Sequence, residues 1–362
     1  IPLRLVGSEM CKETVAISLS KQAGEAIVQG SETRFKNATG FDEKKNTADL
    51  VTETDQNTEK LVCEAIKDKY PDHKYVGCVP RPTPKYWQLV QIIGEETWAA
   101  GEHPTLTNEP TWIIDPIDGT TNFVKGFPFV CISIGFVYEG DPVIGVIYAP
   151  FLGYLCAARK GHGAFMTTPL HPERRPLPLV TPQPLPSFKQ ALIAFEWGSD
   201  RSAEVMEKKS RTYKRLVGDK QSGIEGGEMA LGVRSMGSAA LNFVHVAMGC
   251  LDAYWEIGCW AWDVCAGIVI AREAYVSTQA HLGCICVSNK PLQWLCGGWI
   301  QSTGEQRACP ELISTGHNNA NVLTGRKYLV VRAIGDGNQE SGVDAQKRII
   351  RTYYDAVEEW DP

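Results

Sequence analysis

The spacing of apolar residues predicts two helices in the first part of the chain. In residues 8–29 an apolar side chain recurs every four positions, which is typical of one face of an α-helix, and Gly30 is placed to end that helix. A second helix is expected to begin near Asp55, whose carboxylate complements the helix dipole, and to stop at Pro71. The pattern therefore predicts two amphipathic helices.

Alternating apolar and polar positions then predict strands. Residues 130–159 contain three such stretches separated by turn sequences, which is typical of an antiparallel meander. Residues 168–188 are rich in proline and predict an extended connection. We place the boundary between two subdomains there, with residues 1–180 in one and 181–362 in the other, and we expect them to form one continuous catalytic unit.

The second half of the chain alternates between the two periods. Residues 202–216 predict a charged helix, residues 233–256 a strand, a helix and a strand, and residues 262–274 another helix. A final helix is expected near residues 343–360. Residues 223–232 are rich in Gly and Glu but lack Gly-Lys-Ser/Thr, so they predict a loop that is not a P-loop. The patterning alone indicates a mixed α and β fold with meanders.

One segment joins a predicted strand to candidate chemistry. The apolar run 112–114 predicts a buried strand that ends at Asp115, because Pro116 has no N–H to donate to a ladder. Asp118 follows three residues later, before a Gly-Thr-Thr run whose backbone N–H groups can bind a phosphate oxygen. Two carboxylates beside such amides can hold Mg²⁺ next to a phosphate ester. The alternative is that Asp-Pro and Asp-Gly form two ordinary turns.

Composition narrows the classes of function. A net charge of −6 and the lack of a basic cluster with interleaved aromatics argue against nucleic-acid binding. The 12 cysteines form no Cys-x-x-Cys pair, which favours reduced thiols in the cytosol, and the 7 histidines include no His-Glu-x-x-His zinc motif. The longest apolar run, residues 127–138, is too short to cross a bilayer. We expect a cytoplasmic protein with no membrane partner. No signal peptide is recognisable, but the chain begins at Ile1 rather than Met, so its true N-terminus stays open.

Three motifs together resemble one enzyme family. Residues 115–123, Asp-Pro-Ile-Asp-Gly-Thr-Thr-Asn-Phe, closely resemble the signature of the inositol monophosphatase family, which comprises Mg²⁺-dependent, lithium-sensitive phosphatases. The Gly-Glu-Glu of residues 94–96 and the Trp-Asp of residues 262–263 resemble two further motifs of the family, in the expected order. The resemblance implies a layered αβαβα sandwich of the sugar phosphatase type, usually dimeric. It also implies hydrolysis of inositol monophosphate or a similar sugar monophosphate.

The resemblance also implies a role for each residue of the site. The ligands of two Mg²⁺ ions would be Glu95, Asp115, the Ile117 carbonyl, Asp118 and Asp263. Thr120, hydrogen-bonded to Asp55, would orient the water nucleophile, and Glu95 could assist as a base. The residues that would bind the substrate are Gly119, Thr120, Gly237, Ser238, Ala239 and Glu256.

Two segments interrupt the resemblance. Residues 78–93 and 275–296 separate motifs that follow one another directly in the family pattern, and we interpret both as intervening sequence carried into a predicted gene product. True loops are the competing account. The apolar run 89–93 can replace the displaced strand and deliver Glu95 to its place. The alternatives to an active monophosphatase are a non-catalytic or misfolded relative disabled by these insertions, or another phosphatase of the superfamily, such as a bisphosphate nucleotidase. The sequence does not name the physiological substrate.

Overall fold

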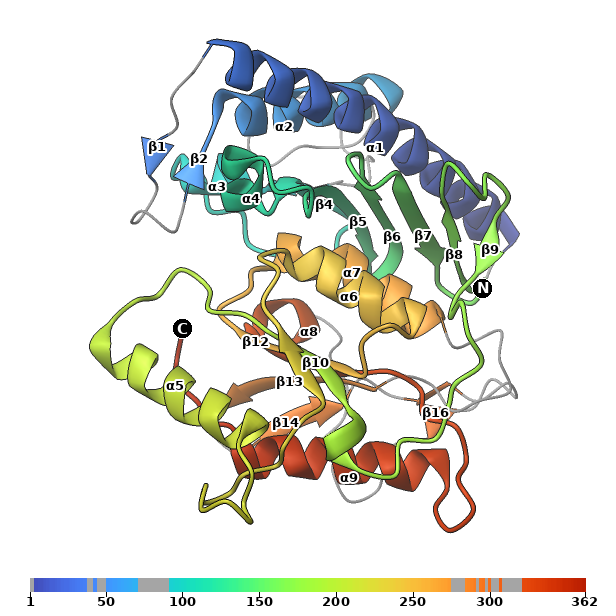
Figure 1. The fold of residues 1–362 in the computed structure, drawn as a ribbon. Coiled ribbons are helices and arrows are strands. Elements are labelled where there is room, and N and C mark those ends of the chain that lie inside the picture. Colours follow the sequence, from blue (N-terminus) through green and yellow to red (C-terminus); the bar gives the residue numbers. More distant parts are fainter. Residues whose placement is uncertain are drawn as a thin grey trace.

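Helices and sheets alternate in five layers (Figure 1). The structure is a computed structural model, and it describes the following residues: 3–37, 42–43, 50–70, 91–274, 284–290, 293–296, 299–300, 306–307 and 321–362. Within them a helix pair covers a seven-stranded sheet, a second helix pair lies between this sheet and a six-stranded one, and a third pair covers the far side. The predicted layered αβαβα sandwich is therefore confirmed.

The first layer consists of α1 (Leu3–Asn37) and α2 (Glu53–Lys69). Gly30 does not end α1 as the sequence predicts, because it faces α2 in the interior of the helix pair. A Cβ at Gly30 would lie within 3.0 Å of the Thr54 side chain, so the missing side chain lets the two helices approach closely. The second helix begins after the N-cap residue Thr52, as expected near Asp55.

The first large sheet has its strands in sequence order. They are β3 (Gln91–Gly94), β4 (Thr111–Asp118), β5 (Cys131–Tyr138), β6 (Asp141–Ala149), β7 (Tyr154–Arg159), β8 (Ala164–Thr167) and β9 (Arg175–Pro176). Strand β3 pairs with β4 in parallel, and the others pair antiparallel, which confirms the predicted meander. Residues 91–93, the described part of the apolar run 89–93, lie in β3 directly before Glu95, as expected if this run forms the strand that delivers Glu95.

The second large sheet has the order β11-β10-β12-β17-β13-β14. Its strands are β10 (Leu192–Phe195), β11 (Gly232–Arg234), β12 (Ala253–Ile257), β13 (Cys284–Lys290), β14 (Gln293–Cys296) and β17 (Lys327–Val331). Strands β13 and β14 belong to the segment 275–296, and β13 pairs antiparallel with β17. All strands of the first large sheet precede residue 180 in the sequence, and all strands of the second follow it. The division into two subdomains at that point stays a prediction.

The remaining helices complete the layers. They are α3 (Glu95–Ala99), α4 (Thr120–Lys125), α5 (Ala203–Val217), α6 (Ala239–Met248), α7 (Ala261–Glu273), α8 (Asn321–Thr324), α9 (Gly342–Ala356) and the 3₁₀ turn η1 (Phe188–Gln190). Short pairs of strands are β1 (Asp42–Glu43) with β2 (Leu50–Val51), and β15 (Trp299–Ile300) with β16 (Gln306–Arg307). Among the described residues, no helix combines the length and apolar character that crossing a membrane requires.

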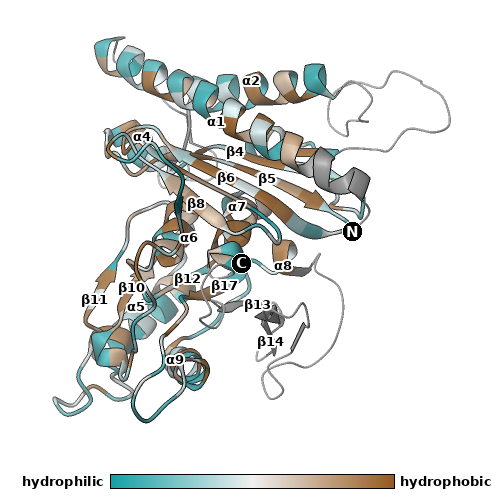
Figure 2. Ribbon diagram, turned by 90° about the vertical axis from the view of Figure 1, so that its right-hand side faces the viewer, coloured by the Kyte–Doolittle hydropathy of each residue, from teal (hydrophilic) through white to brown (hydrophobic). Residues whose placement is uncertain are grey.

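Helix α7 packs directly against the first sheet, whose strands are largely brown, and so apolar, in Figure 2. Gly135 of β5 and Gly145 of β6 are directly opposite each other in the ladder. A Cβ at Gly135 would lie within 3.0 Å of Cys265 Sγ, and a Cβ at Gly145 within 3.0 Å of the Ala266 carbonyl oxygen. These paired glycines therefore form a notch that receives α7, the helix that carries Asp263.

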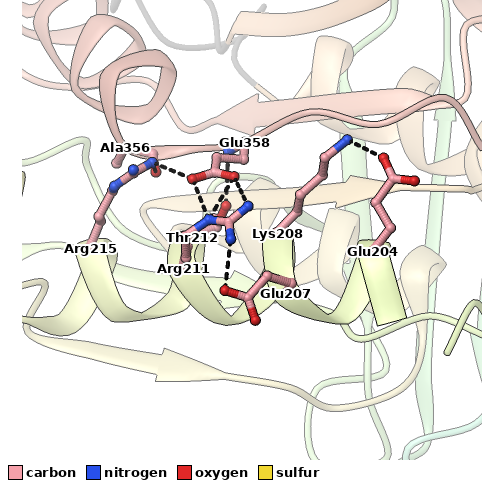
Figure 3. A network of polar contacts seen from close by, with 8 residues as sticks. All are labelled: Glu204, Glu207, Lys208, Arg211, Thr212, Arg215, Ala356 and Glu358. Carbon is pink, nitrogen blue, oxygen red and sulfur yellow. Dashed lines mark hydrogen bonds and ion pairs between the residues drawn. The ribbon is translucent and has the colours of Figure 1, made fainter. Parts of the chain in front are cut away.

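The segment after α9 turns back onto α5 (Figure 3). Glu358 accepts hydrogen bonds from Arg211 Nε at 2.8 Å and Nη2 at 2.7 Å, and Arg215 Nη1 lies 3.1 Å from it. Trp360 packs edge-on against Trp255, with 5.7 Å between ring centroids. Helix α9 therefore ends at Ala356 rather than near residue 360, because these contacts need an extended backbone.

Candidate active site

An irregularity in β4 puts two carboxylates on the same side of the strand. Contrary to the sequence prediction, Pro116 does not end the ladder: Asp115 is opposite Ser133, and pairing resumes with Asp118 opposite Cys131. Three steps along β4 thus match two steps along β5, which is a β-bulge. Residues three apart on a regular strand face opposite sides, and one extra residue reverses that alternation. The bulge therefore brings the two carboxylates together.

Helix α7 adds a third carboxylate to this pair. One oxygen each of Asp115, Asp118 and Asp263 lies within 4.8 Å of the others. Asp263 is in the first turn of α7, where its Oδ2 also accepts a 2.6 Å hydrogen bond from the Trp260 backbone N–H. The Asp263 side chain therefore both caps the start of α7 and belongs to the acidic cluster.

The acidic cluster carries charge repulsion that a cation would relieve. Burial, and then the charges of Glu95, Asp118 and Asp263, raise the pKa of Asp115 well above its ordinary value. Burial raises the pKa of Asp118 to about 6 despite its hydrogen bonds, and burial followed by the Glu95 charge raises that of Asp263. Carboxylate oxygens are hard ligands of the kind that Mg²⁺ binds in proteins. The residues present therefore fit a divalent cation.

Glu95 is held beside the cluster by a buried glutamate on α2. Glu59 accepts hydrogen bonds from the backbone N–H groups of Glu96 at 2.7 Å and Thr97 at 2.9 Å, which fixes the first turn of α3. A Cβ at Gly94 would lie within 3.0 Å of the Glu59 carboxylate, so the glycine of the Gly-Glu-Glu motif is required by this contact. Sequence reasoning assigned no role to Glu59. The glycine at position 94 could have indicated that another group packs closely against the motif.

Thr120 and Asp55 make the contact that the family resemblance implies. Thr120 Oγ1 lies 3.1 Å from Asp55 Oδ1 and 3.0 Å from the Ile117 carbonyl oxygen. Asp55 Oδ2 accepts hydrogen bonds from the backbone N–H of Thr52, at 2.9 Å, and from its hydroxyl. The capping box of α2 thus fixes the Asp55 carboxylate that accepts from Thr120.

Ser238 connects Asp118 to α6. Its hydroxyl donates to Asp118 Oδ2 at 2.5 Å, and the same oxygen accepts from the Ala240 N–H at 2.8 Å. Ser238 is also the N-cap of α6, where its Oγ accepts from the Leu241 N–H at 3.2 Å. One side chain therefore both caps a central helix and orients a carboxylate of the cluster.

Replacing Ser238 with Ala is expected to lower the free energy of unfolding by about 1–2 kcal/mol, because a helix cap and a hydrogen bond to a buried carboxylate are lost together. Mg²⁺ affinity should also fall, since Asp118 loses the donor that orients it. Urea unfolding and Mg²⁺ titration would measure the two effects. Ser238→Thr is the matched control that keeps the hydroxyl. An alanine variant with unchanged stability and affinity would contradict the assignment.

Two side chains with no role predicted from the sequence order the loop before α6. Glu196 accepts from the backbone N–H groups of Met236 at 2.7 Å and Gly237 at 3.0 Å. Asn122 Nδ2, from α4, donates to the carbonyl oxygens of Met236 at 2.7 Å and Phe129 at 2.9 Å. Asn122 belongs to the signature motif of residues 115–123, which could have indicated its role. Nothing in the spacing of the sequence indicated a role for Glu196.

A cavity of about 780 Å³ opens beside the cluster. The predicted site residues that line it are Glu95, Asp118, Gly119, Thr120, Gly237, Ser238, Ala239, Glu256 and Asp263. Asp55, Asp115 and Ile117 are buried and do not line it. Burial and the nearby charge of Glu196 raise the pKa of Glu256 to about 8. The structure thus brings all predicted site residues to one cavity or directly behind its wall.

Comparisons with known proteins agree with this fold and site. A sequence model of the Inositol monophosphatase family matches residues 10–78 and 84–303. Quinic acid degradation cluster protein x of Neurospora crassa is 35% identical over 368 positions, covering 96% of this chain and 94% of the relative. Inositol monophosphatase 2 of Saccharomyces cerevisiae is 43% identical over 270 positions, covering 74% and 80%. A solved inositol monophosphatase from Anabaena has the same fold, with a TM-score of 0.61 and 23% identity, covering 95% of this chain and 97% of that one.

The sequence matches, which agree with the fold and the acidic site, indicate a phosphatase of the phosphoric monoester hydrolase class. The chain belongs to the inositol monophosphatase family. The family match is interrupted at residues 79–83, inside the segment 78–93, but it runs through residues 275–296. That the two segments are insertions stays a prediction.

Proposed function

We propose that this protein hydrolyses inositol monophosphate, or a similar sugar monophosphate, in a Mg²⁺-dependent reaction that releases phosphate. The observation that carries this proposal is the convergence of three carboxylates from β4 and α7 within 4.8 Å, at the edge of a cavity of about 780 Å³, a volume typical of small-molecule sites. Membership of a phosphatase family supports the same reaction class. The homodimer that the resemblance implies and the cytoplasmic location that the cysteine pattern indicates stay predictions.

The protein's own groups divide the work of the reaction. Residues that would hold the metal ions are Glu95, Asp115, the Ile117 carbonyl, Asp118 and Asp263. When bound, Mg²⁺ would offset the charge of the phosphate and lower the pKa of water. The Thr120 hydroxyl, held by Asp55, would orient the attacking water, and Glu95 would accept a proton from it. Backbone N–H groups of Gly119 and Thr120 would hold phosphate oxygens.

The other side of the cavity would bind the leaving group. Gly237, Ser238, Ala239 and Glu256 line it, and polar groups there suit the hydroxyls of a cyclitol or sugar. The relatives carry different names: one belongs to a quinic acid degradation cluster and another is an inositol monophosphatase. A panel of cyclitol and sugar monophosphates would identify the preferred ester.

Purified protein is expected to release phosphate from inositol 1-phosphate when Mg²⁺ is present, to stop when EDTA is added, and to be inhibited by lithium. Colorimetric phosphate detection would measure the rate, and circular dichroism would show that the sample is folded. A folded sample without turnover on any ester of the panel would overturn the proposal and favour a non-catalytic relative.

A further inference from the structure

The ammonium group of Lys209 lies in the cavity wall with hydrogen-bonding capacity to spare. Lys209 belongs to α5 and is 1% exposed, and its Nζ donates to the Trp197 carbonyl, which also accepts from Arg201 at 2.6 Å. An ammonium group has three N–H donors. Among the residues that the structure describes, the Trp197 carbonyl is the one hydrogen-bond acceptor of Lys209 Nζ. Two donors are therefore left for another group.

Gly198 leaves an open space between Lys209 and Glu256. A Cβ at Gly198 would lie 3.6 Å from Lys209 Nζ and 3.8 Å from Glu256 Oε1, and apart from Gly198 and its two chain neighbours no other described residue has an atom within 4 Å of that point. All three residues line the cavity that the acidic cluster borders. A hydrogen-bond donor and an acceptor thus face one space that no described side chain fills.

An aromatic ring helps to hold the ammonium group in this position. Lys209 Nζ lies 5.0 Å from the centroid of the Trp360 ring, a cation–π contact. Trp360 is fixed in turn by the ion pairs of Glu358 with Arg211 and Arg215 (Figure 3). Burying a cation is costly unless polar partners compensate. A well-fixed buried ammonium with unused donors is the arrangement expected of a binding residue.

We propose that Lys209 is a substrate-binding residue which, together with Glu256, binds hydroxyl groups of a polyol leaving group in the space above Gly198. This proposal rests on the proposed function. A hydroxyl oxygen can accept from the ammonium, and a hydroxyl hydrogen can be donated to Glu256 Oε1, whose partner oxygen Oε2 already accepts from the Tyr254 hydroxyl. A leaving group without hydroxyls would leave both groups unpaired, and sites built for a hydroxyl strongly reject analogues that lack it. Lys209 therefore favours polyol esters over apolar ones.

The test compares inositol 1-phosphate with cyclohexyl phosphate, which has the same ring size and no hydroxyls. Replacing Lys209 with Met is expected to lower kcat/KM for inositol 1-phosphate about tenfold or more, mainly through KM, because charged hydrogen bonds contribute more than neutral ones. The loss for cyclohexyl phosphate should be much smaller. Lys208→Met is the matched control, since Lys208 pairs with Glu204 at 2.8 Å away from the cavity lining (Figure 3).

A second variant guards against a Lys209 substitution that does not fold. In Gly198→Ala the added methyl group would occupy the proposed hydroxyl position. Because Gly198 has a φ of 56°, where alanine is strained, circular dichroism and Tm first establish that the variant is folded. The same selective loss for inositol 1-phosphate is then expected. Equal losses for both esters, or no loss for inositol 1-phosphate, would overturn the role of Lys209 while leaving the phosphatase proposal intact. A folded wild-type protein that hydrolyses neither ester would instead overturn the proposed function, and this inference with it.

Discussion

Replacing Asp115 with Asn is expected to reduce kcat by roughly a thousandfold or more, because a metal ligand supplies several kcal/mol of transition-state stabilisation. Asp115 lies behind the cavity wall with an oxygen within 4.8 Å of one from Asp118 and one from Asp263. The charges of Glu95, Asp118 and Asp263 act on it. Steady-state phosphate release with Mg²⁺ would measure the effect. Asp355→Asn, at an exposed position of α9, is the control. Near-normal turnover of the Asp115 variant would place the metals elsewhere.

The same variant should be more stable than the wild type when no metal is present. A carboxyl whose pKa is raised by folding opposes folding once the pH exceeds its ordinary pKa near 3.8, since the unfolded chain loses the proton first. At neutral pH the amide removes that penalty. Thermal unfolding in EDTA should therefore show a higher Tm for Asp115→Asn, whereas added Mg²⁺ should raise the Tm of the wild type and barely change that of the variant. A lower Tm of the variant in EDTA would argue against charge repulsion in the cluster.

Replacing Gly145 with Ala is expected to damage both stability and activity. The new Cβ would meet the Ala266 backbone within 3.0 Å, so α7 would have to move away from the sheet. Overpacking of this kind costs about 1–3 kcal/mol of unfolding free energy. Because α7 carries Asp263, a displacement of about 1 Å would reduce kcat/KM by up to roughly a hundredfold.

Urea unfolding and phosphate release would measure these two effects. Gly232→Ala in β11 is the matched control, because its added Cβ would meet only the flexible ends of Leu192 and Arg234, at 3.2 and 3.3 Å. That control should stay close to the wild type. If Gly145→Ala were equally mild, the notch under α7 would not position Asp263.

Much of the site could be predicted because its parts are local or carry recognisable motifs. The bulged end of β4 supplies Asp115 and Asp118 from one short signature, and the apolar run before Glu95 forms the strand that delivers it. The hydrogen bond between Thr120 and Asp55, implied by the family resemblance, is present. The αβαβα layers were implied by the same resemblance, whereas patterning alone indicated only a mixed fold.

The errors and omissions have a common physical cause, which is contact between distant segments. Gly30 reads as a helix end until its neighbour Thr54 is known, and Pro116 reads as a strand end until the bulge is seen. Glu59 and Glu196 act through backbone N–H groups that lie 37 and 40 residues away in the sequence. No spacing rule indicates such partners before the chain is folded.

The notch formed by Gly135 and Gly145 makes the distance between the first sheet and α7 depend on residues of both elements. Because a Cβ at residue 135 would collide with the Cys265 sulfur, these two positions should vary together among relatives: a larger residue in the strand should be accompanied by a smaller one in the helix. Position 145 has no such outlet, since its neighbour is main chain. Substitutions of Gly145 should therefore lower activity although this residue lies in the middle of a sheet and does not line the cavity.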